Sequence, residues 1–134
     1  MSIMMKRTLF FLLTITLFAI PQVHAQAVME MEKTSHNFGK FQESVPQTYV
    51  FKFKNTGDEP LVIQQAMSSC GCTVPQYTKT PIKPGESGEI SVTYNGKGKY
   101  PGRFKKGITI RSNAKNSLMR IYVEGEMEEA KKEK

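Results

Sequence analysis

The segment Ser68–Pro75 contains both cysteines of the chain, Cys70 and Cys72, with only Gly71 between them. In an extended strand both side chains would point the same way, and their Cα atoms would lie about 7 Å apart, at the upper limit for a disulfide. Gly71 would let the backbone bend and shorten that distance. A disulfide that closes so small a ring would stabilise the fold little, and it would be strained and readily reduced.

Four interpretations of this pair stay open. It can form a local disulfide with only a conformational role, a dithiol that exchanges with partners, a soft-metal site, or two reduced cysteines packed as small apolar side chains. Two thiolates suit Cu(I), to which Met67 could add a thioether and His36 an imidazole. The simpler interpretations are a core residue for Met67 and a polar loop residue for His36. Structural zinc is disfavoured because it needs four ligands, and a second cysteine pair is missing.

A basic segment runs from Lys97 to Arg120 without an acidic residue. Its candidate anion-binding residues are Arg103, Lys105, Lys106 and Arg111. Along a strand, all of these except Lys106 would share one face. Such a face could bind acidic polysaccharide, lipid headgroups or a negatively charged protein. The alternative is a solvated face whose lysines discourage pairing between sheet edges.

No catalytic constellation is apparent. The two histidines are His24 and His36, and no G-x-S-x-G, H-E-x-x-H, phosphate-loop or dinucleotide-binding pattern occurs. An enzyme is therefore disfavoured, and no cofactor is predicted apart from the Cu(I) alternative. Nucleic acid is also disfavoured as a partner, because the chain carries an export signal and no element known to read bases.

The N-terminus predicts a signal peptide over residues 1–25. Lys6 and Arg7 precede the apolar run Leu9–Ile20, and Pro21 and small residues lead to a cleavage position after Ala25. The run is shorter than the roughly 20 residues that span a bilayer, so no membrane span is expected after cleavage. An uncleaved anchor is the alternative. The mature protein is expected in the periplasm or outside the cell, and cleavage lowers the formal net charge from +7 to +5, since residues 1–25 hold two cations and no acid.

Apolar and polar residues alternate over short runs in the remainder of the chain, which is typical of half-buried strands. The clearest runs are Thr48–Lys54, Leu61–Ala66, Glu89–Tyr94, Arg103–Arg111 and Leu118–Met127. Lys106 and Gly107 interrupt the pattern of their run, which indicates a bulge or a strand edge. We find no amphipathic helix after the signal peptide. Six or seven short strands favour an all-β antiparallel sandwich over residues 26–127, with a small closed barrel as the alternative and 128–134 as a charged tail.

Turn residues separate these runs. In Asn55–Pro60, Gly57 can take a positive φ and Asn55 can close a side-chain turn. Pro84 and Gly85 form a Pro-Gly turn. Asn37-Phe38-Gly39 reads as a bend with Phe38 anchored in the core. The residues that we single out as structural are Phe38, Gly39, Asn55, Gly57, Pro60, Gly71, Pro84 and Gly85.

The segments His36–Phe41, Tyr49–Gly57, Pro60–Ile63, Ser69–Pro75 and Ile82–Gly85 resemble, in order and spacing, the bacterial domain-of-unknown-function family numbered 1573. The resemblance covers nearly the whole mature chain. That family is similar to the immunoglobulin-like domains of the major-sperm-protein and Hydin type. The resemblance implies an exported sandwich of about seven strands, often from bacteria of the Bacteroidetes kind, and no established activity.

We therefore expect an exported, non-enzymatic β-sandwich that binds a protein or glycan of the cell envelope. The first alternative is a periplasmic thiol-redox or Cu(I)-binding protein that uses Cys70 and Cys72, with Met67 as a further candidate. The second is an anion-binding domain that uses the basic segment Lys97–Arg120.

Overall fold

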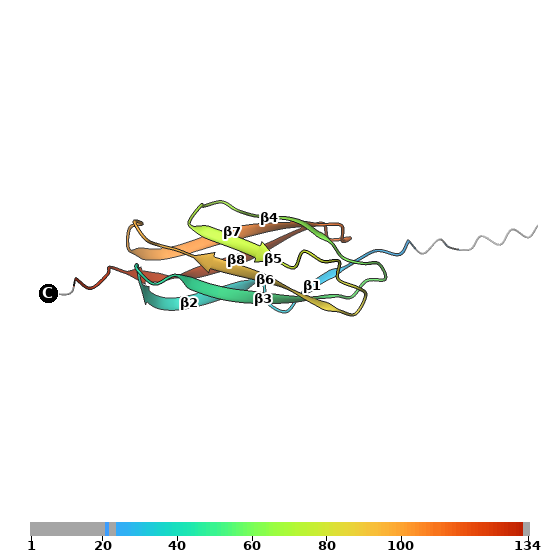
Figure 1. Cartoon of the computed structure of the whole chain (residues 1–134), viewed down its shortest axis with the longest axis horizontal. Coiled ribbons are helices and arrows are strands. Elements are labelled where there is room, and N and C mark those ends of the chain that lie inside the picture. Colours follow the sequence, from blue (N-terminus) through green and yellow to red (C-terminus); the bar gives the residue numbers. More distant parts are fainter. Residues whose placement is uncertain (1–20, 22–23, 133–134) are drawn as a thin grey trace, which may run out of the picture.

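The computed structural model describes residue 21 and residues 24–132, and it is all-β. Figure 1 shows two layers of strands that run lengthwise along an elongated sandwich. The strands are β1 (Met29–Met31), β2 (Ser35–Gln42), β3 (Gln47–Asn55), β4 (Ile63–Ser68), β5 (Thr73–Tyr77), β6 (Ser87–Tyr94), β7 (Gly102–Ser112) and β8 (Leu118–Glu128). The signal peptide predicted for residues 1–25 and the end of the predicted tail lie mostly outside the described residues. Among those that are described, no helix has the length and apolarity to cross a membrane.

Each layer is a four-stranded sheet. The first sheet has the order β1-β3-β6-β5 and the second β2-β8-β7-β4. All neighbouring strands are antiparallel except β2 and β8, which are parallel. Because β1 and β2 belong to different sheets, the N-terminal part of the chain contributes an edge to each. The predicted immunoglobulin-like sandwich is confirmed.

Three strands, β1, β2 and β5, lie outside the runs that the sequence pattern predicts. The clearest case is β5. Its residues Thr73–Tyr77 include Pro75, which lacks the N–H that a central strand would need. The strand lies at the edge of the first sheet, next to β6 alone, and an edge tolerates proline.

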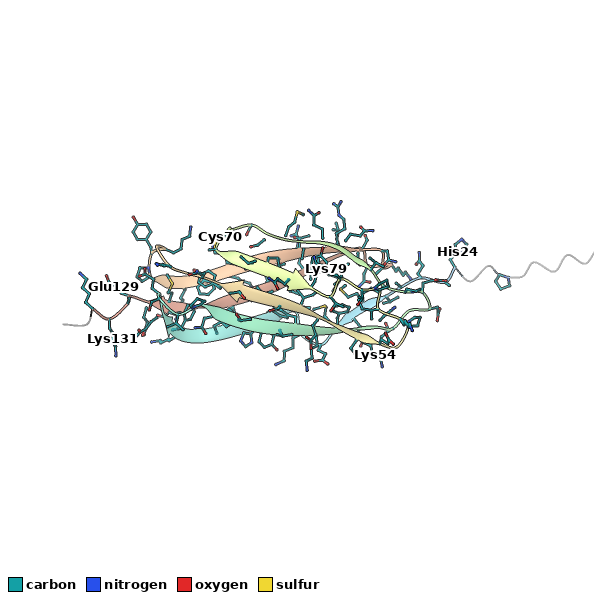
Figure 2. All side chains as sticks on the ribbon, in the orientation of Figure 1. His24, Lys54, Cys70, Lys79, Glu129 and Lys131 are labelled. Atoms are coloured by element: carbon teal, nitrogen blue, oxygen red, sulfur yellow. A yellow bond between two sulfur atoms is a disulfide. The ribbon has the colours of Figure 1, made fainter. Side chains whose placement is uncertain are left out.

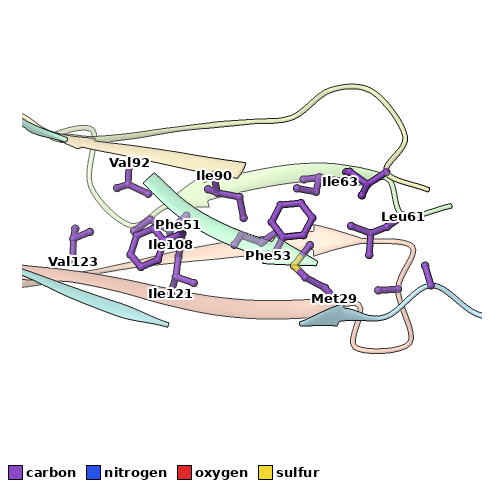
Figure 3. Packing of buried hydrophobic residues seen from close by; sticks show 14 residues of the cluster. Met29, Phe51, Phe53, Leu61, Ile63, Ile90, Val92, Ile108, Ile121 and Val123 are labelled. Carbon is purple, nitrogen blue, oxygen red and sulfur yellow. The ribbon is translucent and has the colours of Figure 1, made fainter. Parts of the chain in front are cut away.

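The main core lies between the sheets and follows from the alternation in the sequence. Figure 3 shows Phe51 and Phe53 of β3 among aliphatic side chains from both layers. The fully buried members are at most 1% exposed: Phe51, Phe53, Leu61, Ile90, Val92, Ile108, Ile110, Ile121 and Val123. Burying one such side chain contributes about 1.5–3 kcal/mol, so this cluster is the main source of stability.

Asn55 ties the loops together at one end of the sandwich. Its side chain is fully buried, and its Oδ1 accepts hydrogen bonds from the backbone N–H groups of Val28, at 3.3 Å, and Gly57, at 3.0 Å. Its Nδ2 donates to the carbonyls of Glu59, at 2.7 Å, and Ile82, at 2.9 Å. One amide therefore joins the entry to β1 with the loops after β3 and before β6.

Gly57 differs from the expectation. Its φ is not positive; the constraint is a close approach to the N-terminal segment. A Cβ on Gly57 would lie 2.1 Å from the carbonyl oxygen of Gln26, and the backbone N–H of Asp58 donates to that same oxygen at 2.9 Å. Any side chain at position 57 would push the first segment away from the sandwich.

The Pro84-Gly85 turn has the geometry that this dipeptide favours. Gly85 has a φ of 81°, and the N–H of Glu86 donates to the carbonyl of Lys83 at 2.9 Å. A positive φ at the third turn position is easily adopted only by glycine. The turn is held against β3 by a hydrogen bond from Gly85 N to Asn55 O, at 2.7 Å.

The bend in β2 lies at Asn37-Phe38-Gly39. The pairing of β2 with β8 shifts register between Asn37 and Lys40, and Gly39 N donates to Asn37 Oδ1 at 2.7 Å. Phe38 is partly buried and packs against the core.

Replacing Asn55 by alanine should lower the free energy of unfolding by at least about 2 kcal/mol, because the part-buried N–H groups of Val28 and Gly57 and the carbonyl of Glu59 lose their partner. The buried carbonyl of Ile82 loses one of its two donors and keeps Leu61 N. Asn113→Ala is the matched control. Asn113 also bridges two backbone groups, Val62 N at 2.7 Å and Pro60 O at 3.0 Å, but it is exposed, so water can replace it at a cost of about 0.5–1 kcal/mol. Chemical denaturation of both variants measures the difference. Equal losses would show that Asn55 has no special role.

Candidate functional site

The cysteine pair lies where the chain crosses between the two sheets. β4 ends at Ser68 in the second sheet and β5 begins at Thr73 in the first, so residues 69–72 make the whole crossing. Cys70 and Cys72 form a disulfide with a Cα–Cα distance of 5.2 Å, and the N–H of Thr73 donates to the carbonyl of Cys70 at 3.1 Å. The pair thus lies in a tight turn, and its Cα atoms are closer than in an extended strand. Figure 2 shows Cys70 in the half of the sandwich where Glu129 and Lys131 lie, away from His24.

The two cysteines differ in exposure. Cys72 is 9% exposed and belongs to a second, smaller core with Phe41, Tyr94 and Met127. Cys70 is half-buried at the margin of that cluster. The more accessible sulfur is therefore expected on Cys70.

Aromatic rings build this second core. Tyr94 stacks on Phe104 with ring centroids 3.9 Å apart, and Phe41 meets both rings edge-on, at 6.0 and 5.8 Å. Burial raises the pKa of the Tyr94 phenol above its ordinary value. The carbonyl of Cys72 accepts a hydrogen bond from Asn95 N at 2.8 Å, which anchors the crossing to the loop after β6.

The structure does not place Met67 in the core. Met67 is 44% exposed on β4, opposite Thr109 of β7, so its interpretation as a core residue is wrong. Both cysteine sulfurs are engaged with each other, and a Cu(I) site would first require the reduced pair. Within residues 24–132, no group of three or more His, Cys, Asp or Glu side chains is arranged to hold a metal ion.

His36 lies on β2 and not in a loop. Its ring stacks on Tyr49 of β3 with centroids 3.7 Å apart and meets Phe38 edge-on at 5.0 Å. It therefore joins an edge of one sheet to a strand of the other through ring contacts. Burial, and to a smaller extent the charge of Lys33, lowers the pKa of His36 below its ordinary value.

In the folded protein, acidic residues from outside the basic segment lie beside two of its cations. The pairing of β7 with β8 places Arg103 opposite Glu126 and Lys105 opposite Glu124, two acids from outside the segment. Arg103 Nε lies 3.8 Å from Glu126 Oε2, on exposed side chains. The sequence indicates that these two acids lie on the outward face of the last strand, because Glu124 and Glu126 alternate with core residues there.

The other two basic candidates lie elsewhere. Arg111 is opposite Leu118, at the far end of β7 from Arg103. Lys106 is opposite Val123, which points into the core, so Lys106 lies on the inner side of β7 and is half-buried. The four candidates therefore do not form one continuous anion-binding surface.

A polar groove lies over β2, β8 and β7. It has a volume of about 610 Å³, and its lining combines cations with acids: Asn37, Gly39, Lys40, Arg103, Phe104, Lys105, Glu124, Gly125 and Glu126. The mixed charge fits a polar ligand better than a simple anion.

The most distinctive backbone feature is a free edge on β7. β4 pairs with β7 only from Ile63–Ser112 to Ser68–Ile108, because the chain then turns into the crossing. In the described part of the chain, no backbone hydrogen bond joins Gly102–Gly107 to residues 69–72. Of the two expectations for Lys106 and Gly107, the bulge is wrong, since the β7–β8 register is continuous, and the strand edge is present.

These features define an immunoglobulin-like β-sandwich with a two-cysteine turn at one sheet crossing. The chain belongs to the family described as protein of unknown function DUF1573, whose model matches residues 29–127. No curated protein sequence matches it.

Solved structures agree on the fold. A protein of unknown function from Porphyromonas gingivalis W83 is similar with a TM-score of 0.66 and 22% identity, over 81% of this chain and 51% of that one. This chain thus spans about half the length of that protein. The ASH/PapD-like domain 7 of human CEP192 is similar with a TM-score of 0.65 and 10% identity, over 88% of this chain and 98% of the domain. The Pseudomonas aeruginosa CupB2 chaperone has a TM-score of 0.52 and 12% identity, over 78% of this chain and 57% of the chaperone.

Acidification should destabilise the protein through His36. Its pKa is lower in the folded chain than in the unfolded chain, so below about pH 6.5 the unfolded chain binds more protons and stability falls. His36→Phe keeps a ring for stacking but cannot titrate. The free energy of unfolding, measured at about pH 7.5 and about pH 5.5, should drop more for the wild type than for H36F. Equal drops would contradict the assignment.

Proposed function

We propose that this protein is an exported, non-enzymatic module that binds an extended segment of a cell-envelope protein. The segment would add as a strand to the free edge of β7, Gly102–Gly107. The observation that carries the proposal is the early end of β4, whose pairing stops at Ile108.

The edge offers backbone groups that a partner strand can use. β8 occupies one side of Gly102–Gly107, and alternate N–H and C=O groups face the other side. An extended segment beside them would continue the ladder that β4 begins. Main-chain hydrogen bonds supply affinity in this mode of recognition, and side chains at alternate positions supply specificity.

The charges on this edge select the partner. Arg103 and Lys105 point outward, Lys106 lies on the inner side, and exposed Lys97 and Lys99 precede the strand. Two copies of the edge would repel each other, because like charges would be opposed across the new pair. A segment with acidic residues at alternate positions would instead place opposite charges face to face.

Two further observations support the proposal. The sequence carries a basic pair followed by an apolar run at its N-terminus, which supports export. The similar fold of a protein described as a chaperone supports protein binding by a sandwich of this type. A glycan would instead have to use the polar groove over β2, β8 and β7, which leaves the free edge unexplained.

Charge reversal on the edge tests the proposal. The probe is a synthetic peptide that alternates glutamate and valine. It should perturb the backbone amides of Gly102–Gly107 in an NMR titration of the labelled protein, and Lys105→Glu, on the outward face that the glutamates of the peptide would oppose, should weaken binding about fivefold, which corresponds to about 1 kcal/mol. Lys115→Glu makes the same charge change on an exposed turn between β7 and β8 and should leave the affinity unchanged.

Two results would count against edge binding. One is a peptide that perturbs the groove residues and not the edge. The other is an equal loss of affinity in K105E and K115E, which would reflect only the net charge of the protein.

A further inference from the structure

We propose that Cys70–Cys72 is a thiol–disulfide exchange site for a protein dithiol. In this site an external thiolate attacks Cys70 Sγ, and the hydroxyl of Thr73 stabilises Cys72 as the leaving thiolate. The inference rests on contacts of the two sulfurs and is independent of strand addition to β7.

Access favours attack on Cys70. Cys70 is half-buried at the margin of the small core, whereas Cys72 is 9% exposed within it. The outside of the turn is open: Gly71 is exposed, and a Cβ built on it would meet nothing within 4 Å. An incoming thiol can therefore reach the turn from the Gly71 side.

Each sulfur has a hydrogen-bond donor. The backbone N–H of Cys72 donates to Cys70 Sγ at 3.2 Å. Thr73 Oγ1 lies 3.7 Å from Cys72 Sγ, and because a disulfide sulfur carries no proton, the hydroxyl is the donor. Hydrogen bonds to the charged form lower a thiol pKa, and a thiolate of lower pKa leaves faster.

The Thr73 hydroxyl is dedicated to this sulfur. Thr73 is 3% exposed, and in the described part of the chain the one hydrogen bond of its side chain goes to Cys72 Sγ. Cys72 lies among Phe41, Tyr94 and Met127, where an unassisted thiolate would be poorly solvated. Thr73 supplies a donor where burial would otherwise oppose charge on the sulfur.

The surrounding backbone keeps the two sulfurs together after reduction. The carbonyl of Cys70 accepts from Thr73 N at 3.1 Å, and the carbonyl of Cys72 accepts from Asn95 N at 2.8 Å. Neither hydrogen bond depends on the S–S bond. A ring that joins residues two apart also adds little chain entropy to stability, so its opening leaves the sandwich folded.

The exchange takes place in two steps, in which atoms and electrons balance. The first thiolate of the partner dithiol bonds to Cys70 Sγ, the Cys70–Cys72 bond breaks, and its electron pair leaves on Cys72 Sγ. The second partner thiolate attacks the partner's own sulfur in this mixed disulfide and releases Cys70 as a thiolate. The partner is oxidised to a disulfide, and the pair is reduced to two thiolates, which take protons from solvent. The reverse sequence oxidises Cys70 and Cys72 at the expense of a partner disulfide.

Thr73→Val and Thr73→Ser test the assignment on the intact chain. Valine keeps the shape and removes the hydroxyl, and serine keeps the hydroxyl. With dithiothreitol as the probe, reduction of the folded protein, followed by alkylation and mass spectrometry, should be three- to tenfold slower in T73V than in wild type and near wild type in T73S. In the reduced proteins, the pH dependence of Cys72 alkylation should show a higher thiol pKa in T73V alone, a result that a purely structural role of Thr73 would not produce.

Two results would overturn the proposal. The first is a reduction rate that does not depend on dithiothreitol concentration, because the bond would then open only when the protein unfolds. The second is a T73V rate and thiol pKa equal to those of T73S while circular dichroism shows all three proteins folded.

The attacked sulfur can be identified separately. With oxidised glutathione as the probe, Cys72→Ser, which leaves Cys70 free, should form the mixed disulfide several-fold faster than Cys70→Ser. Equal or inverted rates would assign the attack to Cys72 and contradict the role given to Cys70.

Discussion

The structure depends on a short crossing. The chain leaves the second sheet at Ser68 and enters the first at Thr73, with four residues between. A crossing this short must turn sharply, and the Cys70–Cys72 disulfide together with the hydrogen bond from Thr73 N to Cys70 O holds that turn. The position of the turn decides where β4 stops. That in turn decides how much of β7 is left with one neighbouring strand, so the position of the disulfide and the free edge have one structural origin.

The two ends of the sandwich are stabilised by different kinds of interaction. One end uses buried or bridging amides: Asn55 joins three loops, and Asn116 exchanges two hydrogen bonds with the backbone of Met29, at 3.1 and 2.7 Å. The other end uses stacked and edge-on aromatic rings around Cys72. The amide side chains fix the loops at one end through hydrogen bonds, whereas the cluster at the other end is apolar, with the disulfide as its most polarisable member.

Local patterns predicted the sandwich but not its edges. The alternation of Tyr49, Phe51 and Phe53 predicts a strand with one buried face, and β3 has this alternating burial. β5 was missed, because Pro75 argues against a central strand and a single sequence does not show which strands lie at an edge. The acids opposite Arg103 and Lys105 were missed for a related reason, since cross-strand partners follow from the register of β7 and β8. Glycine at position 57 was predicted to be required for a positive φ, but it is required by a close approach to Gln26. Local sequence does not show that contact, because the two residues are far apart in the chain.

Residue-resolved amide hydrogen exchange along β7 tests the central claim most directly. Residues Ile108–Ser112 have β4 on one side and β8 on the other, so their amides should all be protected. In Gly102–Gly107, the amides that face β8 should be protected, and those that face away should exchange rapidly. Alternating protection that begins at Gly107 is the predicted result. Uniform slow exchange over the whole of β7 would show that another part of the chain covers the edge, and it would contradict the account.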